Sequence, residues 1–123
     1  MITIENYING ELVAPTEGKY IDNYNPSKGE VYSQIPNSQA NDVEKAVKAA
    51  SDAFPAWSKT PKNERSKILI RLANLIDENL VELAKAEAMD NGKPYSLATR
   101  VDIPRASANI RFFATAILHN ASE

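Results

Sequence analysis

The sequence predicts a mainly α-helical chain of three to four helices, preceded by short β-strands that include a hairpin. Beyond residue 37, apolar residues recur every three or four positions, which is the period of a helix packed on one side. The first 36 residues instead carry short apolar segments separated by turn residues. We therefore divide the chain into strands and turns at 1–36 and a helical part at 37–123.

The strands are predicted from their turns. Asn9-Gly10 lies between two short apolar segments and favours a hairpin with strands at 6–8 and 11–13. Two alternating segments, 20–24 and 31–35, flank a turn in which Gly29 supplies a positive φ. These two segments are expected to be strands that could pair with each other.

The first helix is expected over 38–54. Ser38 or Asn41 can cap its start, and Pro55 is expected to end it. Its buried stripe is predicted to consist of small and apolar residues at helical spacing, namely Val43, Ala46, Val47, Ala50 and Phe54.

The longest helical pattern runs from Thr60 to Asn91. Thr60 is expected to cap it, with Pro61 in the first helical position. A break is plausible near 77–79, where charged and cap-prone residues gather. Gly92 is expected to end the pattern in the left-handed conformation.

The last helix is expected to begin at Asp102, which would act as its N-cap. Its apolar side is predicted to contain Ile110, Phe113, Ala114, Ile117 and Leu118. Phe112 and Phe113 are adjacent and face different sides of that helix, so each needs cover. We expect the chain to be part of a larger molecule that provides it.

Composition excludes several classes of function. The net charge of −2 gives no reason to expect nucleic acid or an anionic membrane as partner. No apolar run approaches the roughly 20 residues of a membrane span, and no signal peptide is visible, so we expect a cytoplasmic protein. The absence of cysteine excludes disulfides and a cysteine nucleophile within these residues.

No residue of this chain is predicted to be catalytic or to bind a cofactor. A single histidine, His119, cannot build a metal site by itself, and it has no evident acid partner for nucleophilic catalysis. The carboxylates on the helical patterns are best interpreted as solvated faces. Neither a G-x-G-x-x-G motif nor a P-loop is present.

Five segments in order resemble the N-terminal part of the aldehyde dehydrogenase superfamily. They are Tyr7-Ile8-Asn9-Gly10-Glu11, Asn25-Pro26-Ser27-Lys28-Gly29-Glu30-Val31, Ala53-Phe54-Pro55-Ala56-Trp57-Ser58, Glu64-Arg65 and Asp90-Asn91-Gly92-Lys93-Pro94. Two further segments, 101–105 and 111–114, are most similar to the branch that oxidises 2-aminomuconic and 2-hydroxymuconic 6-semialdehydes.

The resemblance implies a parent protein with the α/β aldehyde dehydrogenase fold, in which 37–123 would be the helical part of an incomplete cofactor-binding domain. Such a parent oxidises an aldehyde to the carboxylate, using a cysteine thiolate, a glutamate-activated water and NAD or NADP. None of those groups can be placed in this sequence, so we expect the chain alone to be inactive and to bind neither nucleotide. The alternative is a stand-alone truncated module, structural or for interaction, that binds a partner subunit.

Two further expectations follow from the resemblance. Many members hold a monovalent cation, which here implies the backbone carbonyls of Asn23 and Tyr24 and the carboxylate of Asp102 as ligands. We do not expect tight binding. The protein is also expected to be a homo-oligomer, and in this chain Phe112 or Phe113 is expected at the contact.

Overall fold

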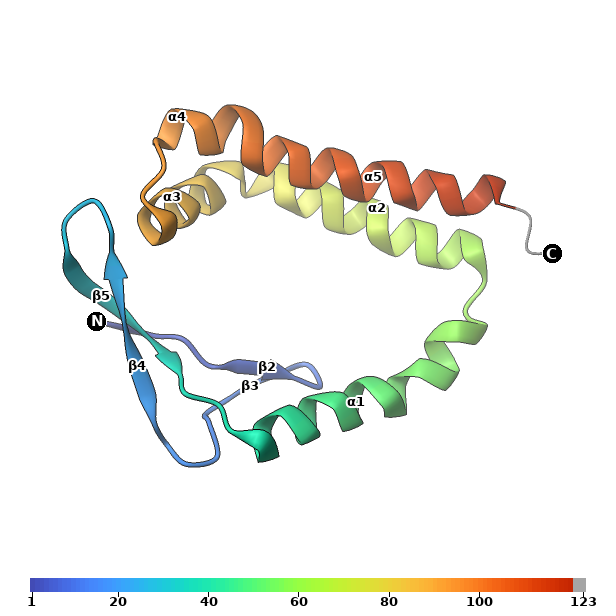
Figure 1. The fold of residues 1–123 in the computed structure, drawn as a ribbon. Coiled ribbons are helices and arrows are strands. Elements are labelled where there is room, and N and C mark those ends of the chain that lie inside the picture. The colour runs from blue at the N-terminus through green and yellow to red at the C-terminus, as the bar shows by residue number, and fades with distance from the viewer. Residues whose placement is uncertain (121–123) are drawn as a thin grey trace. The chain divides into compact units, whose positions relative to one another are not determined.

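The structure, a computed structural model, describes residues 1–120. It consists of two units, Met1–Lys59 and a second that begins at Thr60, and each is described by itself below (Figure 1). The helices of 12 or more residues are α1, α2, α3 and α5, and the strands all lie in the first unit. This confirms the predicted mainly α-helical chain with short N-terminal strands.

The hairpin forms as predicted. Strand β2 (Asn6–Ile8) pairs antiparallel with β3 (Glu11–Val13), and the residues between them both have positive φ, 53° at Asn9 and 85° at Gly10. Such a turn matches the right-handed twist of its strands, because the asparagine tolerates this region and glycine enters it freely.

A second sheet has the strand order β1-β5-β4. Strand β4 (Tyr20–Asn25) runs antiparallel to β5 (Glu30–Pro36), so the predicted pairing is confirmed, and Gly29 in their turn has a φ of 70°. Strand β1 (Ile2–Thr3) adds parallel to β5 and was not predicted, because two residues carry no recognisable alternation.

Helix α1 (Ala40–Lys59) differs from its prediction at both ends. Ser38 precedes the capping position and Asn41 lies inside the first turn, so neither caps the helix; the carboxylate of Asp42 instead accepts the backbone N–H of Gln39 at 2.9 Å. Pro55 lies within the helix and does not end it. A proline removes one helical hydrogen bond, and the axis of α1 bends in its last turns (Figure 1).

The stripe predicted to be buried on α1 is largely exposed in this chain. Val43, Val47 and Phe54 are exposed over 57%, 59% and 65% of their surface. Part of the alanine surface, with Ala46 and Ala50, lines a hollow beside the β2–β3 hairpin. The apolar residues of α1 do recur at helical spacing, but within residues 1–120 their side chains are not buried.

In the second unit, the long pattern divides into α2 (Lys62–Glu78) and α3 (Leu80–Asn91). The predicted break is confirmed at Asn79, whose side chain donates to the carbonyl of Leu75 at 2.8 Å. Gly92 ends α3 with a φ of 78°, also as predicted. Pro61, and not Thr60, occupies the capping position of α2.

The last helix has no capped start. Helix α4 (Tyr95–Leu97) continues through a π-helical turn, η1 (Ala98–Asp102), into α5 (Ile103–His119). The N–H of Ile103 donates to the carbonyl of Ala98, so the preceding turn already satisfies it. Asp102 has helical φ and ψ of −67° and −53° and makes no capping hydrogen bond, so the predicted N-cap is wrong.

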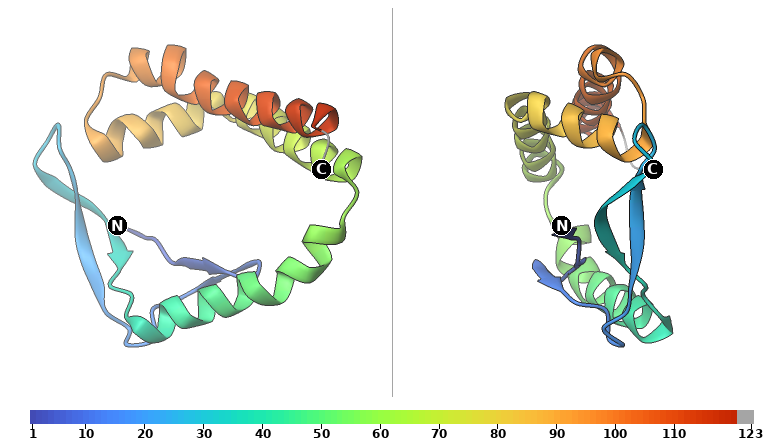
Figure 2. Two further views of the ribbon diagram at one scale, coloured as in Figure 1. Left: turned by 45° about the vertical axis from the view of Figure 1, so that its right-hand side comes forward. Right: turned by 90° about the vertical axis from the view of Figure 1, so that its left-hand side faces the viewer.

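Helices α2 and α5 lie side by side and run in opposite directions (Figures 1 and 2). Their buried residues are all small: Ser66 and Ala73 on α2, and Ser107 and Ala114 on α5. Both pairs are seven residues apart, which is two helical turns, so each helix presents a flat strip to the other. The Ser107 hydroxyl donates to the carbonyl of Ala73 at 3.4 Å, which requires close backbones.

A larger side chain in this strip is expected to separate the helices. Ala114 is fully buried, so Ala114→Leu should lower the free energy of unfolding of the second unit by about 1–3 kcal/mol through overpacking. Urea unfolding followed by circular dichroism measures this. Ala108 is exposed on the same helix, and Ala108→Leu is the matched control, with an expected change within about 0.5 kcal/mol. Equal losses for the two variants would contradict the close packing.

Candidate functional site

The candidate cation ligands fall in different units. Asn23 and Tyr24 are neighbours in β4, where the pairing with β5 shifts register. The side-chain amide of Asn23 donates to the hydroxyls of Tyr32 and Ser33, both at 3.1 Å. These bonds hold the Asn23 side chain on the sheet, and the family resemblance implied the backbone carbonyl of this residue as the cation ligand. Asp102 belongs to the second unit.

The carboxylate of Asp102 is paired with a lysine. The ammonium of Lys93 lies 2.8 Å from Asp102 Oδ2 and 3.1 Å from Glu87 Oε1, and each of these side chains is only about a third exposed. Asn91 links the same group: its amide donates to Glu87 Oε1 at 2.6 Å, and its Oδ1 accepts the backbone N–H of Lys93 at 3.0 Å. We call Glu87, Asn91, Lys93 and Asp102 the Lys93 cluster.

The Lys93 cluster joins the end of α3 to η1. Hydrogen bonds to Asp102 and to Glu87 raise the pKa of Lys93, so its ammonium is the resident positive charge of the cluster. Carboxylate and carbonyl oxygens suit a hard cation, so the residue types fit one. At Asp102 Oδ2, however, a cation would have to compete with Lys93. No local sequence pattern predicts this ion pair, because Lys93 and Asp102 are nine residues apart.

A second polar cluster surrounds Asp42 at the start of α1. Its Oδ1 accepts the backbone N–H of Thr16 at 2.8 Å and the Thr16 hydroxyl, and the residue is 4% exposed. The Thr16 hydroxyl and the backbone N–H groups of Gln39 and Thr16 lower the pKa of Asp42. An ionised carboxylate with its oxygens occupied is a poor proton acceptor, so Asp42 ties the loop around Thr16 to the helix.

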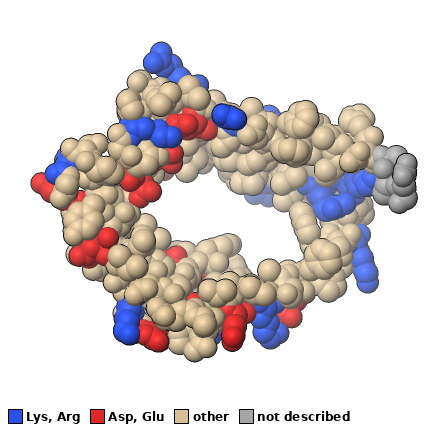
Figure 3. Space-filling model, in the orientation of Figure 1, with Lys and Arg blue, Asp and Glu red and all other residues tan. Residues whose placement is uncertain are grey.

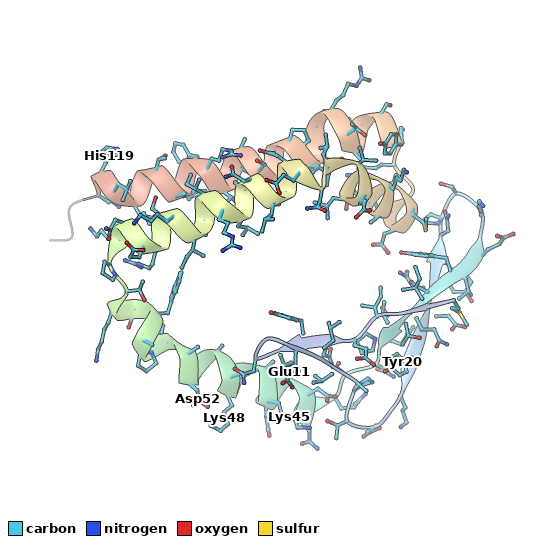
Figure 4. All side chains as sticks on the ribbon, turned by 180° about the vertical axis from the view of Figure 1, so that it is seen from behind. Glu11, Tyr20, Lys45, Lys48, Asp52 and His119 are labelled. Atoms are coloured by element: carbon cyan, nitrogen blue, oxygen red, sulfur yellow. The ribbon has the colours of Figure 1, made fainter. Side chains whose placement is uncertain are left out.

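An open hollow of about 340 Å³ lies beside this cluster. Its lining includes Lys45 and Lys48, which Figure 4 labels on α1 together with Asp52. The Lys45 ammonium donates to the Thr16 hydroxyl at 3.1 Å, and Lys48 pairs with Asp52 at 2.7 Å. Both lysines are thus engaged within the chain, and exposed pairs of this kind contribute little to stability.

The remaining ionisable groups do not converge. In residues 1–120, no three or more His, Cys, Asp or Glu side chains are grouped so as to hold a metal ion. His119 is exposed near the end of α5 (Figure 4). In Figure 3, acidic and basic side chains both appear on the drawn side of each unit, separated by wider areas of uncharged residues. None of the helices described for residues 1–120 has the length and apolar character needed to span a bilayer.

Comparison with known proteins identifies the family. The family model described as "Aldehyde dehydrogenase family" matches residues 12–123. The chain belongs to the aldehyde dehydrogenase family. It is 49% identical over its whole length to 2-aminomuconic semialdehyde dehydrogenase of Bos taurus and 46% identical to that of Homo sapiens, and it covers 25% of each. The chain thus spans about a quarter of the length of these relatives.

Solved aldehyde dehydrogenases share its fold. The apo structure of indole-3-acetaldehyde dehydrogenase aligns with the whole chain at a TM-score of 0.95 and 32% identity, and the chain covers 29% of it. An NAD+ complex of aldehyde dehydrogenase from Bacillus cereus aligns with 92% of the chain at a TM-score of 0.89 and 40% identity, and 23% of that chain is covered. The predicted aldehyde dehydrogenase fold is therefore confirmed for the portion that this chain covers.

The Asp42 cluster predicts an acid-sensitive stability. The folded pKa of Asp42 is lowered, so its contribution is present above the unfolded value of about 4 and is lost as pH falls through the folded pKa. Wild type should therefore lose more stability than Asp42→Asn on acidification below about pH 4. Urea midpoints across this pH range test it, with the exposed Asp52→Asn as control on the same helix. Parallel pH profiles for wild type and Asp42→Asn would exclude the assigned role.

The Lys93 cluster predicts the opposite pH dependence. The folded pKa of Lys93 is raised, so its contribution is present below the unfolded value of about 10.4 and is lost as pH rises through the folded pKa. Lys93→Met should remove this alkaline loss, whereas Lys67→Met, at an exposed lysine of α2, should retain it. Melting temperatures of Lys93→Met, Asp102→Asn and the double variant should be non-additive. Additive effects would mean that Lys93 and Asp102 do not interact.

Proposed function

We propose that this chain is the N-terminal portion of an NAD(P)-dependent aldehyde dehydrogenase that oxidises an aldehyde to the carboxylate, with a muconic semialdehyde as the candidate substrate. The observation that carries the proposal is 49% identity over all 123 residues to a relative named 2-aminomuconic semialdehyde dehydrogenase. The neighbour in complex with NAD+ supports NAD as the cofactor of the whole enzyme, with NADP as the alternative.

The residues of this chain contribute architecture to that reaction. When bound, NAD supplies a hydride acceptor, but the chain has no glycine-rich dinucleotide motif to hold its phosphates and no thiol to attack an aldehyde. The nucleotide and substrate sites are therefore assigned to other parts of the enzyme. Three features stabilise the conformation of this portion next to those sites. They are the small-residue contact of α2 with α5, the Asp42 cluster and the Lys93 cluster.

A stand-alone structural or interaction module is the second candidate. It is favoured by the exposed apolar residues of α1, among them Val47 and Phe54, which a partner subunit could cover. The two candidates differ in what the covering surface belongs to. In the first it belongs to the same enzyme, and in the second to another protein.

A monovalent cation held by the carbonyls of Asn23 and Tyr24 and the carboxylate of Asp102 remains part of the proposal for the whole enzyme. Because Lys93 already pairs with Asp102, we propose a weak site. A cation ligand should make the stability lost in Asp102→Ala depend on the concentration of K+ or Na+. A melting shift that stays the same at low and high concentration of each ion would remove the cation and leave the Lys93 pair.

The chain alone is expected to show no aldehyde oxidation with NAD+ or NADP+, because it has no thiol nucleophile. In a chimera, this chain replaces the matched quarter of the Bos taurus relative. The chimera should show NAD+-dependent oxidation of an aldehyde. NADH fluorescence with a panel of aldehydes, including 2-hydroxymuconic semialdehyde, measures both. Turnover by the mass-verified chain alone would overturn the assignment of chemistry to other parts, and a folded but inactive chimera would contradict the proposed activity.

A homo-oligomer remains our proposal for this chain in isolation, with Phe112 or Phe113 at the contact. Both side chains are largely exposed, so a second copy would remove apolar surface from water. Light scattering at micromolar concentration should give a mass above that of the monomer, and Phe113→Ser should lower it. A monomer mass for both proteins would show that exposed phenylalanines are tolerated without self-association.

A further inference from the structure

The chain contains the dipeptide Asn-Gly twice, at Asn9-Gly10 and at Asn91-Gly92. An asparagine that precedes glycine can react with its own backbone, because glycine has no side chain to obstruct the approach of the two groups. The first dipeptide forms the turn of the β2–β3 hairpin, and the second ends α3. Both glycines have positive φ, but the two sites differ in their hydrogen bonds, and this difference decides which asparagine is free to react.

The reaction is deamidation through a cyclic imide. The backbone nitrogen of the glycine loses its proton and attacks Cγ of the asparagine, the bond from Cγ to the amide nitrogen breaks, and ammonia leaves with the proton. Water then opens the ring at either carbonyl and leaves aspartate or isoaspartate, so no oxidant or reductant is consumed. The attack requires a side-chain amide that can turn onto the backbone and a glycine N–H that is not held by an acceptor.

Asn9 and Gly10 meet both requirements. Both residues are exposed, and the strand pair of Ile8 with Glu11 closes the turn without using the N–H of Gly10. Within residues 1–120, neither this N–H nor the Asn9 side chain has a hydrogen-bond partner. A Cβ placed on Gly10 would meet no other atom within 4 Å, and a hollow of about 360 Å³ lies beside the turn, so water has access to it.

Asn91 and Gly92 meet neither requirement. The side-chain amide of Asn91 donates to Glu87 Oε1 at 2.6 Å, and its Oδ1 accepts the backbone N–H of Lys93 at 3.0 Å. The N–H of Gly92 donates to the carbonyl of Ala88, also at 3.0 Å. All three hydrogen bonds have to break before the glycine nitrogen can attack, and breaking them costs free energy.

We propose that Asn9 is a site of spontaneous deamidation, with isoaspartate among its products, and that the Lys93 cluster keeps Asn91 intact. This modification does not depend on the reaction proposed for the whole enzyme. Isoaspartate adds one carbon to the backbone of a two-residue turn and places a negative charge close to Glu11. The hairpin consists of only three residue pairs whose register is set by that turn, so deamidation loosens the pairing of β2 with β3.

Peptide mass spectrometry follows the reaction at both sites during incubation of the purified chain in neutral buffer. Electron-based fragmentation distinguishes isoaspartate from aspartate, and a parallel incubation in urea removes the folded structure from both sites. Asn9→Gln, whose longer side chain closes such a ring much more slowly, shows whether the change belongs to residue 9. Glu87→Ala removes the acceptor of the Asn91 amide, and Glu82→Ala, at an exposed position of α3, is the matched control.

We expect Asn9 to deamidate at least about tenfold faster than Asn91 in the folded chain, and the two rates to lie within about threefold of each other in urea. Glu87→Ala should raise the rate at Asn91 at least about threefold and leave the rate at Asn9 unchanged, whereas Glu82→Ala should change neither.

Equal rates at Asn9 and Asn91 in the folded chain would overturn the proposal. So would an Asn91 that stays slow in urea, because the local sequence and not the Lys93 cluster would then protect it. An unchanged rate at Asn91 in Glu87→Ala would contradict the protective role of the cluster. A deamidated hairpin peptide that persists in Asn9→Gln would place the reaction at another asparagine and overturn the assignment to Asn9.

Discussion

The contact between α2 and α5 is the constraint on which the second unit depends. Four small residues bring two antiparallel helices together, and a hydroxyl of one helix reaches a backbone carbonyl of the other. Packing of this kind gains stability from many short-range contacts over a flat strip and not from a few large side chains. Large apolar residues such as Ile68, Leu72 and Leu75 of α2 and Phe112 and Phe113 of α5 lie outside this strip and are exposed.

The Lys93 and Asp42 clusters hold segments that the contact between α2 and α5 does not reach. Lys93 forms ion pairs with Glu87 at the end of α3 and with Asp102 in η1, and these pairs hold the connection that returns the chain to α5. Asp42 holds the start of α1, where its carboxylate accepts hydrogen bonds from the backbone N–H groups of Thr16 and Gln39. In both clusters the charged groups are bonded to other residues of the chain, so these groups stabilise its conformation. This is in line with the proposal that the reacting groups belong to other parts of the enzyme.

Features set by a few neighbouring residues could be predicted from the sequence. The Asn9-Gly10 hairpin and the stops at Gly29 and Gly92 follow from backbone freedom at glycine and asparagine, and each appears where expected. The positions of Pro55 and Asp102 within their helices could not be predicted in this way. Pro55 is accommodated inside α1, and Asp102 lies in a continuous helical run with its side chain on Lys93. Both depend on how the chain continues on either side.

The candidate site shows the same division. The family resemblance implied oxygen ligands at Asn23, Tyr24 and Asp102, but an ion pair across nine residues is invisible to local pattern. Composition predicted that these residues supply no cysteine nucleophile, whereas the family could be named only from several short motifs in order. Function here is therefore inferred from relatedness and from surfaces, and the residues of the chain explain how the fold is held.

Hydrogen exchange of the native chain tests the central claim most directly, because it ranks the stability of individual helices. If the small-residue contact holds the second unit together, the slowest amides of that unit should lie in α2 around Ala73 and in α5 around Ser107 and Ala114. The amides of α3 and α4 should exchange faster. Equal or slower exchange in α3 and α4 would contradict the account, because the unit would then be held by contacts other than the one between α2 and α5.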